Sequence, residues 1–287
     1  MAAFPLGPDE LDELIARALA EDVGPGDVTT EALIDRSVAA SGRLIAKEPG
    51  VLAGMPVVRR LIEQVGEGLR LERALSDGAE LEPGTEIGVV AGPCAAMLTA
   101  ERTLLNFLQR LSGMATLTRR YVDAVSGTGA AILDTRKTPP GWRALSKYAV
   151  AVGGGTNHRM GLYDQVLIKD NHLAASGLSA GEAVAAAKER AGGSMRVEVE
   201  VGSPGQARAA AEAGADIVML DNMSAPEMRE AVAAIRELGG ETTIEASGSI
   251  TLETVRAVAE TGVDWISVGA ITHSAPALDI SLDVEAR

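Results

Sequence analysis

Short apolar runs alternate with helical patterns through the second half of the chain. Six runs rich in Val, Ile and Leu occupy residues 130–134, 165–169, 196–201, 216–221, 243–247 and 264–268. Segments with helical spacing separate most of these runs, at residues 179–190, 205–213, 225–238 and 252–260. Strands that alternate with helices at this spacing predict βαβ units and a parallel sheet, either open or closed into a barrel.

The first portion has a mixed α+β pattern. Residues 8–20 carry apolar side chains at helical spacing, and the Gly and Pro residues at 24–26 end that helix. The remaining pattern predicts strands at 43–47, 51–54 and 69–75, a helix at 56–65, a turn at 27–30 and a tight β-ribbon at 78–93. Thr99 is the expected N-cap of a helix with a buried leucine stripe, and a second helix is expected at 115–125.

Composition narrows the class of protein. Only 2% of the 287 residues are aromatic, so the core must be aliphatic, and a net charge of −14 argues against nucleic acid or an anionic membrane as partner. The single cysteine, Cys94, excludes an internal disulfide, fits a reducing cytosol and is expected to be a small buried hydrophobe. The N-terminal residues lack a signal pattern and no apolar run has membrane-spanning length, so we expect a cytoplasmic protein.

A basic island interrupts this acidic chain between residues 134 and 172. It contains six Lys or Arg residues against three Asp residues, and two of the three histidines. A solvated basic face is the ordinary interpretation of such a charge run. Here, however, the cations alternate with Gly153-Gly154-Gly155 and with apolar residues that resemble strands, which favours a concave site for a small ligand with several negative charges.

Polar residues at the strand ends favour a barrel. Lys169, Glu200, Asp221 and Ser247 lie at or next to the C-terminal ends of predicted strands, where α/β barrels carry their chemistry. Glu198 and Glu200 are two residues apart, so both should face the same side of their strand. Lys169 is their expected partner, either in a structural pair with Glu198 or nearer the mouth with Glu200.

Two turns of small residues complete this rim. Ser247-Gly248-Ser249 and Val268-Gly269-Ala270 follow the last two strands, where backbone N–H groups can approach a phosphate closely. Asp221 could hold Mg²⁺ jointly with the phosphates of a ligand. His273, which follows the second turn, is expected to be structural.

Together, these residues resemble the quinolinate phosphoribosyltransferase family over essentially the whole chain. The segments that carry the resemblance are EDVGPGDVTT (21–30), ERTLLNFLQRLSG (101–113), DTRKTPPGWR (134–143), KYAVAVGGGTNHRMGLYDQVLIKDNH (147–172), VEVEV (197–201), DIVMLDN (216–222), EASGSI (245–250) and VGAITHS (268–274). Three residues depart from the family pattern: Pro139 stands where Thr is usual, Trp142 where Leu is usual, and Ser249 where Gly is common.

The resemblance implies an α/β fold: an N-terminal α+β domain (1–114) packed against an open six-stranded α/β (TIM-like) barrel (115–274). A C-terminal segment (275–287) would return to the first domain. It also implies a homodimer that uses Mg²⁺ in NAD biosynthesis. The expected reaction joins quinolinate to phosphoribosyl pyrophosphate and yields nicotinate mononucleotide, pyrophosphate and CO₂.

The family's site residues can be matched one by one. The cations and the hydroxyl expected to bind quinolinate are Arg102, Thr135, Arg136, Lys137, His158, Arg159 and Lys169. Arg102 would come from the neighbouring subunit. Glu200 and Asp221 match the acids that meet the ribose hydroxyls and the metal-bound diphosphate, and with Lys169 they form the expected catalytic set. Phosphate contacts are expected from Ser247, Gly248, Ser249, Val268, Gly269 and Ala270.

Two other classes remain open from the residues alone. Lys169 at a strand end could form a Schiff base, as in an aldolase. The same scaffold could also serve a non-catalytic protein that binds anions or assists transport.

Overall fold

The computed structural model describes residues 3–66 and 68–286, which fall into two compact units. The first unit contains the chain up to Arg119, residues 144–154, and the chain from Ala275 onward. The second unit contains residues 120–143 and 155–274. The division by contacts falls inside a long helix, after Arg119, and residues 144–154 group with the first unit.

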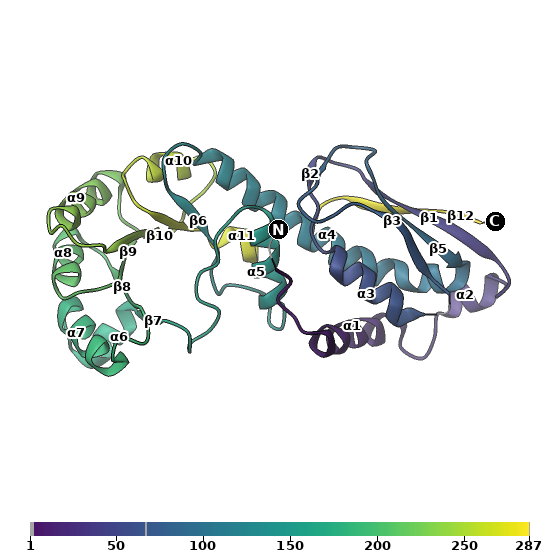
Figure 1. The fold of residues 1–287 in the computed structure, drawn as a ribbon, viewed down its shortest axis with the longest axis horizontal. Helices are drawn as coiled ribbons and strands as arrows, with labels where there is room; N and C mark the ends of the chain where they lie inside the picture. Colours follow the sequence, from purple (N-terminus) through teal and green to yellow (C-terminus); the bar gives the residue numbers. More distant parts are fainter. Residues whose placement is uncertain (1–2, 67, 287) are drawn as a thin grey trace. The chain divides into compact units, whose positions relative to one another are not determined.

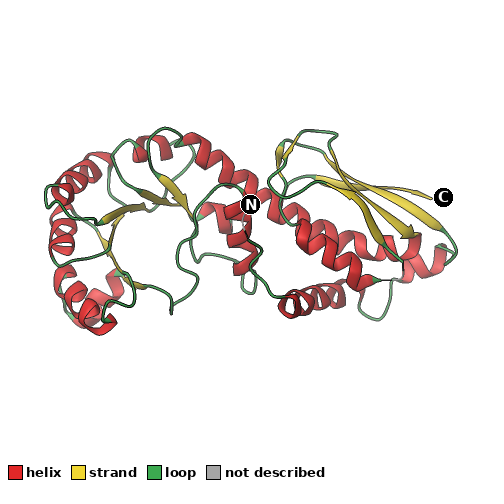
Figure 2. Ribbon diagram, viewed as in Figure 1, coloured by secondary structure: helices red, strands yellow, loops and turns green. Residues whose placement is uncertain are grey.

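An antiparallel sheet forms the first unit's framework, with strand order β12-β1-β5-β3 (Figure 2). Its strands are β1 (Ala39–Ala46), β3 (Arg70–Ala74), β5 (Glu86–Pro93) and β12 (Ile280–Ala286). Every second residue of β1 is buried, as expected for a strand with one face on a core. The C-terminal strand β12 pairs with β1, with Leu282 opposite Leu44, so the end of the chain belongs to this sheet.

Helices account for most of the remainder of this unit (Figure 1). They are α1 (Pro8–Val23), α2 (Val28–Leu33), α3 (Met55–Val65), α4 (Cys94–Ala124) and α5 (Arg143–Val152). Cys94 is buried at the start of α4, as expected. The short strands β2 (Gly50–Val51) and β4 (Glu80–Leu81) pair with each other.

Several local predictions for this region were wrong. Residues 27–30 do not form a turn, because the Asp27 side chain accepts the Thr30 N–H at 3.0 Å and starts α2. Thr99 is not an N-cap: it lies inside α4, and its hydroxyl donates to Asp27. The two expected helices at 99–111 and 115–125 are one continuous helix. Helix α5 was not predicted. Residues 52–54 lie outside β2, although a strand was expected at 51–54. Strand β4 pairs with β2 instead of forming a ribbon with β5.

Gly113 explains why α4 can run through a position that resembles a break. A Cβ added to Gly113 would overlap the backbone carbonyl of Pro276. The helix therefore lies so close to the backbone of residue 276 that only glycine fits at position 113. Gly113→Ala should therefore destabilise the protein by about 1–3 kcal/mol despite the better helix propensity of Ala. Gly205→Ala is the matched control, since no atom lies within 4 Å of its added Cβ. Urea unfolding measures both, and equal stability of the two variants would contradict the close-packing explanation.

The second unit is an open barrel of parallel strands in the order β6-β11-β10-β9-β8-β7 (Figure 1). The strands are β6 (Ala131–Leu133), β7 (Val166–Ile168), β8 (Val197–Val201), β9 (Ile217–Asp221), β10 (Thr243–Ser247) and β11 (Trp265–Ser267). The helices are α6 (Asp170–Ser176), α7 (Ala180–Ala191), α8 (Pro204–Glu212), α9 (Ala225–Arg236), α10 (Val255–Ala259) and α11 (Ala270–His273). The α/β barrel prediction is confirmed, and every strand lies where the apolar runs predicted it. The helices α6 and α11 were not predicted.

The barrel is open between β6 and β7, and an extended segment lies beside β6 at this edge. Thr156 donates its N–H to Ile132 and accepts from the N–H of Asp134, which makes an isolated parallel bridge to Leu133. The buried Asp134 carboxylate then accepts the backbone N–H of His158 at 2.9 Å. These bonds bring the residues after the triple glycine to the carboxyl ends of the strands.

Candidate active site

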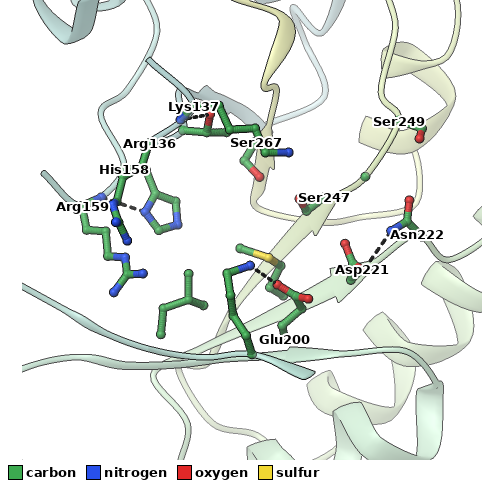
Figure 3. A pocket seen from close by; sticks show the side chains of 15 residues that line it. Arg136, Lys137, His158, Arg159, Glu200, Asp221, Asn222, Ser247, Ser249 and Ser267 are labelled. Carbon is green, nitrogen blue, oxygen red and sulfur yellow. Dashed lines mark hydrogen bonds and ion pairs between the residues drawn. The ribbon is translucent and has the colours of Figure 1, made fainter. Parts of the chain in front are cut away.

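A cavity of about 470 Å³ opens at the carboxyl ends of the barrel strands (Figure 3). Its lining residues are Thr135, Arg136, Lys137, His158, Arg159, Leu167, Lys169, Glu200, Met219, Asp221, Asn222, Ser247, Gly248, Ser249 and Ser267. All of them belong to the second unit. In Figure 3, Arg136, His158 and Arg159 lie on one side, and Asp221, Asn222 and Ser247 lie on the other.

The basic side presents guanidinium groups that are not saturated by protein acceptors. Arg159 donates through Nη1 to the carbonyl of Gln165 at 3.0 Å. The buried Nε atoms of Arg136 and Arg159 have no hydrogen-bond partner among the described residues. Burial, together with the nearby charge of Arg136, lowers the pKa of Arg159. Two neighbouring guanidinium groups with unused donors suit a ligand that carries two carboxylates.

Lys169 and Glu200 face each other across neighbouring strands. Lys169 Nζ lies 2.5 Å from Glu200 Oε2, and the Lys169 side chain is 47% exposed while that of Glu200 is 13% exposed. Glu198, two residues deeper on β8, is instead paired with His158. The alternative of a structural pair between Lys169 and Glu198 was therefore wrong.

The acidic side is shaped by strained turns. Asp221 ends β9, and its Oδ2 accepts from the Asn222 side chain at 2.8 Å, while Asn222 N–H donates to the carbonyl of Ser247. Asn222 and Ser249 both have positive φ, at 53° and 51°. Such conformations cost side-chain-bearing residues of order 1–3 kcal/mol and cluster at functional sites. The φ of Ser249 also gives a physical reason why glycine suits this position, since glycine adopts it without strain.

The structure brings most of the predicted site residues together and leaves four outside the cavity. Arg102 is exposed on α4, in the first unit. Val268 is buried, and Gly269 and Ala270 begin α11 without lining the cavity. A Cβ on Gly269 would nevertheless lie 3.3 Å from the Lys137 side chain, so this turn adjoins the cavity wall. His273, expected to be structural, bonds Ser274 and is not a lining residue.

Four lining residues were missed by the sequence reasoning: Leu167, Met219, Asn222 and Ser267. Leu167 precedes Lys169 by two residues, and Met219 precedes Asp221 by two. Because side chains two apart on a strand face the same way, this spacing was a usable signal for both. For Asn222 and Ser267, the only signal in the sequence was their position at the end of a predicted strand.

One group of side chains has the composition of a metal site. Ligand atoms of His158, Glu198 and Glu245 lie within 4.8 Å of one another. However, the Nδ1 atom of His158 accepts the N–H of Arg159 at 2.7 Å, so the ring proton must lie on Nε2, which faces the carboxylates. A histidine that binds metal through one nitrogen carries its proton on the other. We therefore assign the group as a buried hydrogen-bonded cluster rather than a metal site.

Fold and cavity together define the class: an α/β-barrel protein with a cavity between a cationic wall and an acidic rim at the carboxyl ends of its strands. Family models for the N-terminal and C-terminal domains of quinolinate phosphoribosyl transferase match residues 27–112 and 114–283. The chain belongs to the quinolinate phosphoribosyltransferase family and has that family's enzyme activity in NAD biosynthesis. This membership decides against the aldolase and the non-catalytic alternatives.

Individual relatives agree along nearly the whole length. The chain is 44% identical over 282 residues to a nicotinate-nucleotide pyrophosphorylase [carboxylating] of Mycobacterium leprae, covering 96% of this chain and 98% of the relative. It is 42% identical to the probable enzyme of that name from Bacillus subtilis, covering 96% and 93%. The crystal structure of NadC from Streptococcus pyogenes superimposes with a TM-score of 0.93 at 40% identity, covering 99% and 100%. Within the described part of the chain, the structure contains no helix with the length and apolarity to cross a membrane.

Proposed function

We propose that the cavity binds quinolinate against Arg136, Lys137, His158 and Arg159, and phosphoribosyl pyrophosphate against the opposite rim. The observation that carries this proposal is the division of the cavity into a cationic wall with unused guanidinium donors and an acidic rim beside a Gly/Ser turn. Quinolinate carries two adjacent carboxylates, which guanidinium forks match bidentately. Thr135, whose hydroxyl accepts the Lys137 N–H, supports this wall.

The acids and Lys169 serve the transfer step. Departure of pyrophosphate leaves positive charge on the ribose, which Glu200 and Asp221 stabilise electrostatically. Lys169 pairs with Glu200, and in this proposal it contacts both substrates where they meet. The pyridine nitrogen bonds to the anomeric carbon as the bond from that carbon to pyrophosphate breaks. Loss of the 2-carboxylate as CO₂ then leaves an electron pair on C2, which nearby cations stabilise until C2 takes up a proton from solvent.

Backbone and hydroxyl groups of Ser247, Gly248 and Ser249 hold phosphate in this proposal. Val268, Gly269 and Ala270 adjoin the cavity beside Lys137, and their phosphate contacts stay a prediction. The direct assay is formation of nicotinate mononucleotide from quinolinate, phosphoribosyl pyrophosphate and Mg²⁺. Absence of this product in a folded, metal-supplied sample would overturn the proposal.

Magnesium fits the acidic rim on the chemistry of its donors. Asp221 and Asn222 supply carboxylate and amide oxygens, the hard ligands that Mg²⁺ prefers, beside the turn proposed for phosphate. Asp221 would hold the ion jointly with the diphosphate, and the ion would neutralise charge on the leaving group. The rest of the rim orients the sugar.

Asp221→Asn tests this assignment. Loss of the charge should raise the KM for phosphoribosyl pyrophosphate by about 10- to 100-fold and leave quinolinate binding nearly unchanged, because the lost contact is a charged one. Asp123→Asn, an exposed position on α4, is the control. Steady-state kinetics over a range of Mg²⁺ concentrations, with thermal melts, separate the outcomes. Normal use of phosphoribosyl pyrophosphate together with lost stability would make Asp221 structural.

A homodimer in which Arg102 completes the partner's site is also part of the proposal. Arg102 is exposed on α4 and does not line the cavity formed by the second unit. Large apolar side chains are exposed on α2, at Val28 and Leu33, and after Arg159, at Leu162 and Tyr163. Such side chains suit contact with another chain. A cytoplasmic location is included as well, and the lone reduced thiol of Cys94 supports it.

A further inference from the structure

Two buried carboxylates lie one layer below the cavity. Glu198 on β8 is two residues before Glu200, and Glu245 on β10 is two residues before Ser247, so both point into the barrel below lining residues. Both are fully buried. His158 Nε2 lies 3.2 Å from Glu198 Oε2 and 3.5 Å from Glu245 Oε2. Buried carboxylates at this depth require partners, and the His158 ring is the partner they share.

The tautomer of His158 follows from its second nitrogen. Nδ1 accepts the backbone N–H of Arg159, and an accepting nitrogen carries no proton. The ring proton therefore lies on Nε2, directed at the two carboxylates. The same hydrogen bond links the ring to the backbone of Arg159, and Asp134 holds the backbone N–H of His158. His158 thus connects the buried carboxylates to the cationic wall.

The cluster keeps one more proton than three independent groups would. Burial lowers the pKa at the His158 site, but hydrogen bonds and charge from Glu198 and Glu245 outweigh it, so the cluster holds its proton more tightly than a free imidazole does. Burial, with the charge of Glu245 added, raises the pKa of Glu198 against its bond with His158. Both shifts are in the direction of a more tightly held proton, and the titration belongs to the cluster as a whole.

Geometry places that proton on a carboxyl group. Protonation of Nδ1 would set an N–H against the N–H of Arg159, so the ring is the poorer site. Glu198 already accepts from the Gln165 side chain and lies near the guanidinium of Arg159, which supplies the positive charge on that side. Oε2 of Glu245 faces His158 Nε2 at 3.5 Å, and a ligand oxygen of Glu245 lies within 4.8 Å of one of Glu198, so the negative end of the cluster adjoins the carboxyl that holds the proton.

We propose that Glu198 and Glu245 are positioning residues of the quinolinate site, which hold His158 as the neutral Nε2–H tautomer and, through it, the backbone of Arg159. In this arrangement the proton that the cluster holds lies on Glu198 rather than on the ring. The positive charge that meets the substrate carboxylates comes from Arg136, Lys137, Arg159 and Lys169, and His158 supplies an uncharged ring of fixed orientation. The substrate contact of the ring rests on the function proposed above.

Nitrogen NMR tests the tautomer without any turnover. The chain has three histidines, so ring-¹⁵N labelling gives three sets of signals, and loss of one set in His158→Asn assigns His158. At about pH 7 we expect one protonated and one unprotonated ring nitrogen, with no titration near the ordinary histidine value of about 6.5. Two protonated nitrogens, or titration near that value, would overturn the proposal. The NMR signals are recorded without substrate, so they report the protonation of His158 even if the proposed function is wrong.

Two glutamine substitutions separate the roles of the carboxyl groups. Glutamine resembles a protonated carboxyl, so Glu198→Gln should change the quinolinate KM by no more than about threefold, whereas Glu245→Gln should raise it about 10- to 100-fold. The KM for phosphoribosyl pyrophosphate should stay near its original value in both. Glu189→Gln on the exposed face of α7 is the control. Equal effects, or a larger effect at Glu198, would contradict the assignment, and the NMR experiment on the unchanged protein decides if a variant does not fold.

Discussion

Nicotinate should be used roughly 10⁴-fold less efficiently than quinolinate, measured as kcat/KM, although it is smaller and fits the same cavity. Nicotinate lacks the 2-carboxylate. The buried Nε atoms of Arg136 and Arg159 have no protein acceptor among the described residues, so the missing carboxylate would leave a guanidinium group unpaired. A site built around a charged group rejects an analogue that lacks it because its own groups remain desolvated and unsatisfied.

Arg159→Met tests the cause of this discrimination. The substitution keeps an apolar stem but removes one guanidinium, so kcat/KM for quinolinate should fall about 10- to 100-fold while that for nicotinate changes little. The ratio of kcat/KM for quinolinate to that for nicotinate should therefore fall, because activity with quinolinate is lost while activity with nicotinate is not gained. Arg190→Met, at an exposed position on α7, is the control. Similar kcat/KM values for both acids in the unchanged protein would refute a site for a dicarboxylate.

Mixed subunits should recover activity from two inactive variants. Arg102→Ala and Lys169→Ala should each lose at least about 100-fold in kcat/KM, because each removes a cation proposed to contact substrate. If Arg102 acts in the partner's site, a mixed dimer has one intact site and one that lacks both cations. After random exchange of equal amounts, half of the dimers are mixed, so about a quarter of the original activity should return.

The exchange itself needs an independent check. Differently tagged subunits, captured through one tag and detected by the other, show whether mixed dimers form. A mixture of Arg102→Ala with Arg190→Ala is the comparison, because the second chain then keeps both Arg102 and Lys169. Mixed Arg102→Ala and Lys169→Ala dimers without recovered activity would exclude a site shared between subunits, and a monomer in solution would exclude the dimer itself.

Local patterns predicted the barrel well because its strands are buried on both faces. Residues 217–220 are apolar without interruption between Asp216 and Asp221, and β9 occupies 217–221. The first unit was harder to predict. Gly113 and Ser112 resemble the end of a helix, yet α4 continues through them because the chain near Pro276 packs against that point. Helix α5 was not predicted, and its residues 145–150 are all buried, so burial there does not separate an exposed from a buried face.

The candidate site also has residues that could be placed from the sequence and one pairing that could not. Lys169, Glu200 and Asp221 could be placed from sequence because parallel strands bring their carboxyl ends to one edge. Leu167 and Met219 could have been found by counting two residues back along the same strands. No pattern could show that Glu198 pairs with His158 rather than with Lys169. That choice depends on an extended segment docking at the open edge of the barrel, forty residues away in sequence.

The sequence by itself determined the α/β class, the six strands, the family and the identity of the charged residues, because these follow from local periodicity and from residue types in a specific order. Only the tertiary structure decided which charges meet. It placed Arg102 outside the cavity, joined Lys169 to Glu200, and buried Glu198 and Glu245 around one imidazole ring. The physical reason is that burial and pairing energies depend on distances between side chains, and folding sets these distances through contacts between segments far apart in the chain.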